Sequence, residues 1–132
     1  MNDQATTFEG ELLGLACRVQ RRESDWVFTF SGSRSIAVEC HWRIVSGQGI
    51  ATTDEDHGQH FGLSAPFDAE IRANALLSGA EITSAKIDRT TADVSLSFSN
   101  GHRLELINNS SGYEAWNSGS IIALGGGSLA FF

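Results

Sequence analysis

Residues 28–38 read FTFSGSRSIAV, and residues 96–106 read LSFSNGHRLEL. The two stretches align without a gap, and the large apolar side chains of both fall on even-numbered positions. Because successive side chains of a β-strand point to opposite faces, this alternation is typical of strands that bury one face. A Ser/Gly/Asn-rich interruption in the middle of each stretch predicts a turn. The sequence therefore predicts two copies of one antiparallel hairpin.

Parity sets the length of each hairpin loop. Phe28 can face Ile36 on the buried side only if an odd number of residues connects the two strands. We therefore expect three-residue loops at residues 31–33 and 99–101. An Asn-Gly pair ordinarily predicts a two-residue turn, but the parity of the second hairpin instead places Gly101 in the left-handed conformation of a bulge.

Further alternation extends each hairpin into a three-stranded meander. Apolar residues at odd-numbered positions over 15–19 predict a strand before the first hairpin, and the even-numbered apolar pattern continues after the turn over 36–44. Upstream of the two hairpins, residues 12–14 (LLG) resemble residues 76–79 (LLSG). The repeat therefore covers more than the hairpins themselves.

The predicted architecture is α+β, mainly β, in a single domain that spans residues 1–132. A chain of 132 residues has the usual size of one domain. Its halves, about residues 10–46 and 76–109, are pseudo-duplicated antiparallel meanders that form a sheet or a partly open barrel. A final hairpin is expected over 120–132, and one helix is expected near 66–78.

The segment between the halves is predicted to be a polar loop followed by the helix. Residues 46–64 are polar and contain the acidic cluster at 54–56. Pro66 suits the first turn of a helix, where its missing N–H is not needed. The apolar residues Phe67, Ile71 and Ala75 recur every four positions and predict the buried stripe of that helix, which Leu76 and Leu77 extend.

Acidic residues dominate the charge of the chain. Sixteen Asp and Glu residues stand against nine Lys and Arg residues, which gives a net charge of −7. This balance argues against nucleic acid and anionic membranes as partners, because both bind Lys and Arg. It is compatible with a basic protein partner, with a cation or with solubility alone. The short basic run at residues 18–22 is interpreted as a solvated strand end rather than a nucleic-acid patch.

No targeting segment is visible in the sequence. The first residues lack the basic and apolar regions of a secretory signal, and no apolar run approaches the ~20 residues that span a bilayer. We therefore expect a cytoplasmic protein in which Cys17 and Cys40 are reduced. Both cysteines lie on the apolar side of a predicted strand, which favours a packing role over a catalytic one.

Motifs that would indicate an enzyme or a cofactor are missing from the sequence. It contains no nucleophile elbow, phosphate-binding loop, dinucleotide fingerprint or zinc-binding HExxH helix. We therefore predict no cofactor, and we favour a protein without enzymatic activity over an enzyme. The one metal-binding hypothesis combines the carboxylates of Asp54 and Asp56 with the imidazoles of His57 and His60. The alternative interpretation of this segment is a solvated acidic loop.

Two further groups of residues are candidates for binding. Glu39, His41 and Arg43 alternate along one face of a predicted strand, where they form either an acid–base or anion-binding set or simple cross-strand ion pairs. The second group is Tyr113, Glu114 and Trp116, in a Gly/Ser/Asn-rich stretch. An aromatic pair beside a carboxylate suits an interface anchor, and the alternative is a loop that packs onto the core.

A family resemblance rests on short motifs. Residues 112–116 (GYEAW) precede an apolar run and a glycine-marked hairpin, and residues 39–43 end in Trp42-Arg43. Together with the repeated leucine–glycine units, these motifs resemble those of a family of small uncharacterised bacterial β-rich proteins, a domain of unknown function. The likeness covers most of the chain and implies the fold, but no activity. Some such proteins resemble immunity proteins in size and acidity.

Three hypotheses on function follow from the sequence. The first is a non-catalytic protein-binding module, in one form an immunity-type protein that neutralises a basic toxin. The second is a small-ligand or metal-binding domain around His41 or His57. The third and least favoured is a small enzyme that uses Glu39, His41 and Arg43. Pairing of two copies through an exposed strand edge is a further expectation.

Overall fold

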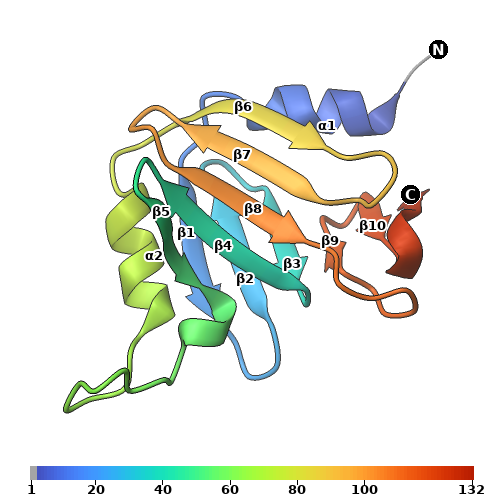
Figure 1. The fold of residues 1–132 in the computed structure, drawn as a ribbon. Coiled ribbons are helices and arrows are strands. Elements are labelled where there is room, and N and C mark those ends of the chain that lie inside the picture. The colour runs from blue at the N-terminus through green and yellow to red at the C-terminus, as the bar shows by residue number, and fades with distance from the viewer. Residues whose placement is uncertain (1–2) are drawn as a thin grey trace.

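The computed structural model describes residues 3–132 and shows two antiparallel β-sheets with two helices (Figure 1). The α+β, mainly β fold class predicted from the sequence is therefore confirmed. In chain order the elements are α1 (Gln4–Leu12), β1 (Cys17–Arg21), β2 (Trp26–Phe30), β3 (Ser35–Val38), β4 (His41–Ser46), β5 (Gly49–Thr53), the 3-10 helix η1 (Asp54–Asp56), α2 (Ala69–Leu77), β6 (Ile82–Ile87), β7 (Val94–Phe98), β8 (Arg103–Ile107), β9 (Trp116–Asn117), β10 (Ile121–Ala123), the 3-10 helix η2 (Gly125–Gly127) and β11 (Leu129–Phe131).

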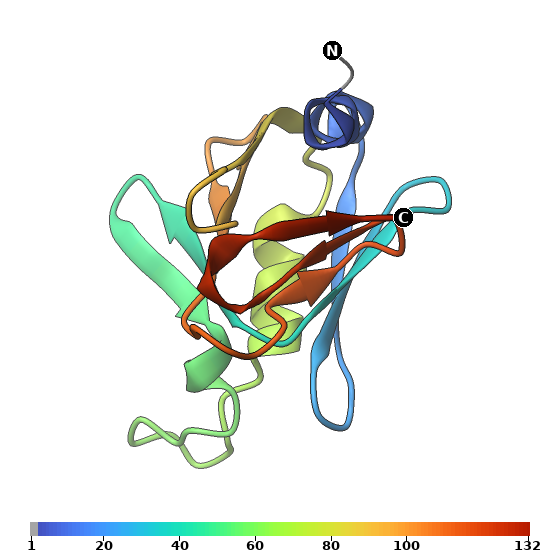
Figure 2. The same ribbon diagram turned by 90° about the vertical axis from the view of Figure 1, so that its right-hand side faces the viewer.

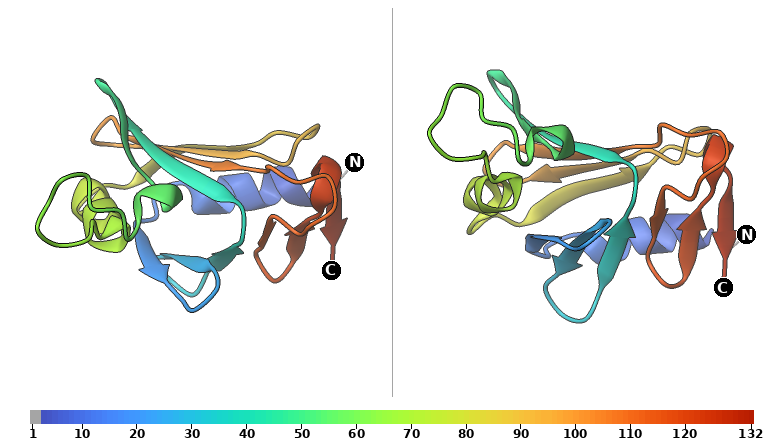
Figure 3. Two further views of the ribbon diagram at one scale, coloured as in Figure 1. Left: turned by 60° about the horizontal axis from the view of Figure 1, so that its bottom comes forward. Right: turned by 90° about the horizontal axis from the view of Figure 1, so that it is seen from below.

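The sheets form two layers with the core between them, and neither closes into a barrel (Figure 3). One sheet has the strand order β1-β2-β3-β9-β10-β11, and the other has the order β5-β4-β8-β7-β6. The largest fully buried side chains include Trp42, Trp116, Phe28 and Leu104, which come from strands of both sheets. Neither helix of the described chain is long and apolar enough to cross a membrane.

The register predicted for both hairpins is confirmed. Phe28 pairs with Ile36 in the first hairpin, and Leu96 pairs with Leu104 in the second. The N–H of Phe30 donates to the carbonyl of Arg34 at 2.9 Å, and Phe98 donates to His102 at the same distance. Each loop therefore has the expected three residues. Gly101 has a φ of 91°, the left-handed conformation that parity required of it.

The three-stranded meander of each half is confirmed as β1-β2-β3 and as β6-β7-β8. The third strand of the first half, predicted over 36–44, is however divided between the two sheets. The chain bends at Glu39 and Cys40, after which β4 leaves β3 and pairs with β8. Buried and exposed positions nevertheless alternate without interruption through the bend. The side-chain pattern therefore predicted the buried face. It did not indicate that the backbone changes its hydrogen-bonding partner at the bend.

The second half makes the reciprocal crossing. Trp116 of β9 pairs with Val38 of β3, just as Trp42 of β4 pairs with Leu106 of β8. Val38 and Leu106 occupy matching positions of the two hairpins. Each half therefore ends in strands that complete the sheet of the other half, and β9, β10 and β11 face the viewer in Figure 2.

The helices differ from the prediction in number and in orientation. The sequence predicted only the helix near 66–78, which the structure places at Ala69–Leu77 with Asp68 as its N-cap, and it missed α1. The predicted buried stripe is wrong for Ile71, which is 67% exposed, and for Ala75, which is also exposed. Leu77 is buried as predicted, together with Ala69 and Ala73. Small alanines on the inner face let α2 approach the edge of β1 closely enough to form hydrogen bonds with it.

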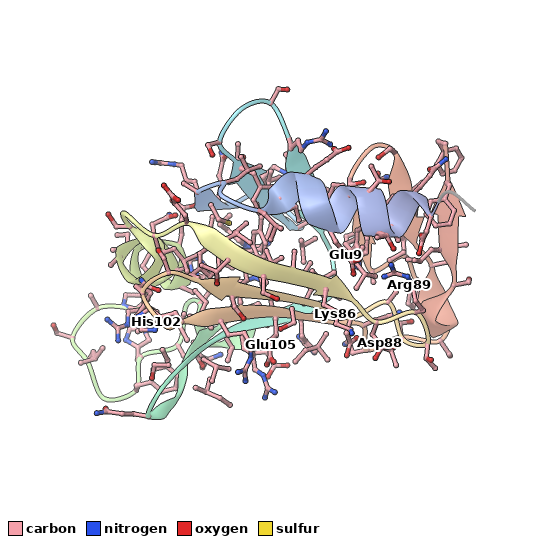
Figure 4. The ribbon with its side chains drawn as sticks, turned by 90° about the horizontal axis from the view of Figure 1, so that it is seen from above. Glu9, Lys86, Asp88, Arg89, His102 and Glu105 are labelled. Atoms are coloured by element: carbon pink, nitrogen blue, oxygen red, sulfur yellow. The ribbon has the colours of Figure 1, made fainter. Side chains whose placement is uncertain are left out.

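Polar side chains of each helix cover a sheet edge. Asn74 of α2 accepts from the N–H of Val19 and donates to its carbonyl, both at 2.8 Å, and Glu70 accepts from the N–H of Arg21 at 2.6 Å. Glu9 of α1 accepts from the N–H of Ile87 at 2.6 Å, at the edge strand β6 of the other sheet (Figure 4). These contacts satisfy edge groups that would otherwise invite pairing with another chain. The opposite edges are β5 and β11, so pairing of two copies through an edge stays a prediction.

The polar segment 46–64 is more ordered than predicted, since it contains β5 and η1. The prediction of a single long loop is therefore wrong. The remaining connection between η1 and α2 runs over residues 57–68. The predicted C-terminal hairpin is confirmed as β10 and β11, which flank Gly125–Gly127.

Candidate functional site

The candidate residues from the two halves meet where β3 crosses into β4, near the lower right end of β4 in Figure 1. The N–H groups of Glu39 and Cys40 both donate to the carbonyl of Ala115, at 2.9 and 3.1 Å. Two shallow cavities of about 240 Å³ each flank this crossing and share Glu39 as a lining residue. Asp25 and Asp54 line one cavity together with the basic Arg21, and Tyr113 and Glu114 line the other. We call this surface the acidic crossing.

Glu39 and Glu114 form a pair of like charges on the acidic crossing. Burial raises the pKa of the Glu114 carboxyl, and the charge of Glu39 and a hydrogen bond between the two side chains raise it further. Neither carboxylate forms an ion pair with Lys, Arg or His in residues 3–132. Two carboxylates this close repel each other when both are ionised, and a cation placed between them would relieve that repulsion.

The two aromatic residues of this segment have opposite surroundings. Tyr113 is 81% exposed, beside Glu114 in the same cavity. Trp116 is fully buried, and its Nε1 donates to the carbonyl of Ala92 at 2.8 Å. The predicted role as an exposed interface anchor is therefore wrong for Trp116, which is a core residue of β9. Tyr113 has the exposure that such an anchor needs.

His41 lies between two acidic residues of η1. Its Nδ1 is 2.8 Å from Oδ2 of Asp54, and its Nε2 is 3.3 Å from Oε1 of Glu55. The other oxygen of Asp54 accepts from the N–H of Trp42 at 3.0 Å, which orients the carboxylate. The hydrogen bond to Asp54 and the nearby negative charges raise the pKa of His41. The structure thus joins two candidates that the sequence treated separately.

A pH dependence of stability follows from this contact. Because the pKa of His41 is raised on folding, its stabilising effect is fully present below its ordinary pKa of 6.5 and is lost as the pH rises through the folded pKa. Asp54→Asn removes the charge but keeps an oxygen for the Trp42 N–H. The Tm difference between the native chain and this variant is therefore expected to be largest between about pH 5 and 6.5 and to shrink toward pH 8.5. Thermal unfolding over this range measures it, and a difference that stays constant with pH would contradict the role of His41.

Arg43 takes part in a cross-strand ion pair on the outer face of the five-stranded sheet. Its Nε donates to Oε1 of Glu105 at 2.7 Å, and Arg103 donates to the other oxygen at 2.9 Å (Figure 4 labels Glu105). Glu39, His41 and Arg43 therefore have three different partners and do not converge on one groove. For Arg43 the structure supports the simpler alternative, a cross-strand ion pair.

The four metal-ligand candidates have separate contacts. Asp54 bonds His41 and Trp42, and Asp56 accepts from the N–H of Thr53 at 3.0 Å. Nδ1 of His57 accepts from the N–H of Ala69 at 3.1 Å, and His60 is exposed. Within residues 3–132, no three His, Cys, Asp or Glu side chains are grouped so that they could hold a metal ion.

Both cysteines are buried and unpaired. Burial raises the pKa of the Cys17 thiol to about 12, and burial is also the main cause that raises the pKa of Cys40 to about 12. Thiols with such high pKa values are poor nucleophiles, as their place on the apolar side of the strands predicted.

No protein-family model, curated protein or solved structure matches this chain significantly. The resemblance to small bacterial proteins of unknown function therefore stays a prediction, and the geometry of the acidic crossing carries the functional interpretation.

Sequence reasoning missed the proximity of Glu39 and Glu114, which the repeat explains only once the crossing of the first half is known from the structure. If Trp42 and Trp116 had been aligned as equivalent residues, the crossing of the first half would have implied a crossing in the second. The segment before Trp116 would then lie beside the segment before Trp42, which brings Glu114 to Glu39. The different lengths of the connections in the two halves hid this equivalence.

Proposed function

We propose that this protein is a non-catalytic protein-binding module whose acidic crossing binds a basic protein. The observation that carries the proposal is that Glu39, Glu114 and the exposed ring of Tyr113 line one cavity of the acidic crossing. A Lys or Arg side chain of the partner, placed between the two carboxylates, would relieve their repulsion. The face of Tyr113 can also stack on a guanidinium group, an interaction of about 0.5–1 kcal/mol at an exposed site.

The charge of the whole chain supports the same class of partner. A net charge of −7 accelerates the encounter with a basic protein, and this steering weakens as salt screens it. A basic toxin neutralised by a small acidic immunity protein is one specific form of this proposal. Its support is the size and acidity of the chain and the unpaired carboxylates at the crossing.

The test is a pull-down with the tagged chain from the native host at low salt, read by native mass spectrometry. The native chain is compared with Glu39→Gln/Glu114→Gln. The control is Glu11→Gln/Glu81→Gln, which makes the same charge change at exposed positions on α1 and just before β6, the elements at the top of Figure 1. We expect a stoichiometric basic partner with the native chain and the control. The crossing variant should bind it at least tenfold more weakly, as expected for a desolvated charge contact.

Two results would contradict the proposal. One is equal capture of the partner by the crossing variant and the control, which would place binding elsewhere on the surface. The other is a partner whose retention does not change between low and high salt, because the electrostatic contribution would then be negligible.

A further inference from the structure

The connection between η1 and α2 carries an exposed apolar tip. We call residues 57–67 the Phe61 loop; it projects at the lower left of Figure 1. Its base is closed by two hydrogen bonds, from the N–H of Gly58 to the carbonyl of Phe67 at 2.8 Å and from the N–H of Phe67 to the carbonyl of Gln59 at 2.7 Å. The ring of His57 ties the base to the first turn of α2 through Ala69. The loop is thus held at both ends by defined contacts.

The tip is a tight turn with a bulky residue at a position that disfavours it. The N–H of Leu63 donates to the carbonyl of His60 at 2.7 Å, which closes a four-residue turn. The two central residues, Phe61 and Gly62, have φ of 50° and 78°, as in a type I′ turn. Asn or Gly is preferred at both central positions, because a side chain in the left-handed region crowds the backbone. Phe61 is therefore in a strained conformation.

Packing within the folded chain does not account for a phenylalanine at this position. The Phe61 side chain is 64% exposed, and Leu63 two residues later is 56% exposed. The one ring contact of Phe61 in the described chain is edge-on with Phe67, at a centroid distance of 6.0 Å. A strained backbone that presents an aromatic side chain to solvent is the kind of outlier from which a functional role can be inferred.

The charges around the loop restrict what it can bind. Residues 54–72 contain five acidic residues and one basic residue, Arg72, and acidic residues stand at both ends of a loop that has no Asp, Glu, Lys or Arg of its own. An anionic membrane surface would be repelled by these carboxylates. A second copy of the chain would bring the same acidic rim and a further charge of −7. A partner surface with an apolar recess surrounded by Lys or Arg would fit both features: the recess would take the apolar tip, and the basic side chains would face the acidic residues at the ends of the loop.

We propose that Phe61 and Leu63 are the apolar anchor that inserts into a recess, rimmed by Lys and Arg, on the basic protein partner. The inference rests on the proposed function, since it assigns a second contact to the same partner. A rigid aromatic anchor in an apolar pocket with charged groups around it is the usual composition of an interface hot spot. The acidic crossing would then provide charge recognition, and the Phe61 loop would provide the slow dissociation that apolar burial gives.

The first test needs no partner. Phe61→Asn places a residue that a type I′ turn favours at the strained position. The Tm of this variant is expected to equal or exceed that of the native chain, because strain is relieved and little packing is lost. A Tm several degrees lower would show that Phe61 serves the fold, and it would overturn the inference.

The second test locates the partner on the loop. A photo-crosslinking amino acid replaces Leu63, and in a control chain it replaces Leu13, which is 50% exposed at the end of α1. We expect host protein to be cross-linked through position 63 only, on an apolar segment flanked by Lys and Arg. The purified cross-linked protein should then bind Phe61→Asn at least tenfold more weakly than it binds the native chain and Leu13→Gln. Equal binding of the three chains overturns the inference.

Other occupants give distinct results. Cross-links to a second copy, with a dimer in analytical ultracentrifugation, would identify self-association and overturn the inference. Binding to phosphatidylglycerol vesicles that is lost in Phe61→Asn would identify a lipid surface and would also overturn it. If the partner is lost in Phe61→Asn but kept in Glu39→Gln/Glu114→Gln, the loop inference stands and the proposed role of the acidic crossing fails. If the partner is instead kept by Phe61→Asn and lost in Glu39→Gln/Glu114→Gln, the proposed role of the acidic crossing stands and the inference on the Phe61 loop fails.

Discussion

Gly127→Ala is expected to destabilise the fold strongly, although it adds only one methyl group. A Cβ at position 127 would lie 2.1 Å from the carbonyl oxygen of Thr90 and 2.8 Å from Cα of Thr91. Both obstacles are backbone atoms, so no side-chain rotation can relieve the overlap. The φ of 104° is a second obstacle, because L-residues avoid it. We expect a loss of at least about 4 kcal/mol, measured as the free energy of unfolding in urea.

Gly32→Ala is the matched control for this effect. Gly32 has a φ of 93°, close to that of Gly127, but nothing lies within 4 Å of a Cβ built there. This variant should therefore show only the cost of the left-handed conformation, about 1–2 kcal/mol. Equal losses at the two positions would contradict a steric clash of the added methyl group with the backbone of Thr90 and Thr91.

Trp116→Ala is expected to lower the free energy of unfolding by about 3–5 kcal/mol, as large-to-small changes of fully buried aromatic residues do. Trp116 has no exposed surface, and its side chain comes from a strand of only two residues, Trp116–Asn117. That short strand joins β3 to β10, so the indole carries much of the packing that holds the last hairpin in the six-stranded sheet. Urea unfolding followed by circular dichroism measures the loss.

A comparison with Trp42 separates the hydrogen bond from the packing. Both indoles are fully buried, but Nε1 of Trp42 has no partner in the described chain, whereas Nε1 of Trp116 donates to Ala92. Ala92 has a φ of 64° and is itself buried. Trp116→Phe should therefore cost about 1–3 kcal/mol more than Trp42→Phe, because it leaves a buried carbonyl without its donor. The reverse order would mean that this hydrogen bond is unimportant.

The candidate site shows where sequence reasoning stopped. Single-residue patterns identified Glu39, His41, Glu114 and Tyr113 as polar or aromatic groups on strand ends and loops. Their partners could not be read from the same patterns, because Glu114 is 75 residues from Glu39 in the chain and is brought to it only by pairing of β3 with β9. The exposure of Tyr113 and the burial of Trp116 likewise depend on that pairing.

The predicted orientation of α2 was wrong for a related reason. Hydrophobic spacing predicted that Ile71 would face the core, yet α2 turns Ala69 and Ala73 inward. The helix is oriented by Asn74 and Glu70, whose side chains bond the edge of β1. Hydrogen bonding to a sheet edge is a tertiary property, so the apolar spacing of the helix alone could not predict which of its sides faces the sheet.

Alternation along the chain by itself determined the two hairpins, their three-residue loops and the buried face of every strand from Cys17 to Ile44. The physical reason is that parity is local: two covalent neighbours must point to opposite sides, and a one-residue slip would expose the whole apolar set. Only the tertiary structure decided which sheet each strand joins, because backbone hydrogen bonds are the same for any partner strand. The reciprocal crossing of β4 and β9, and with it the meeting of Glu39 and Glu114, therefore exists only in the folded chain.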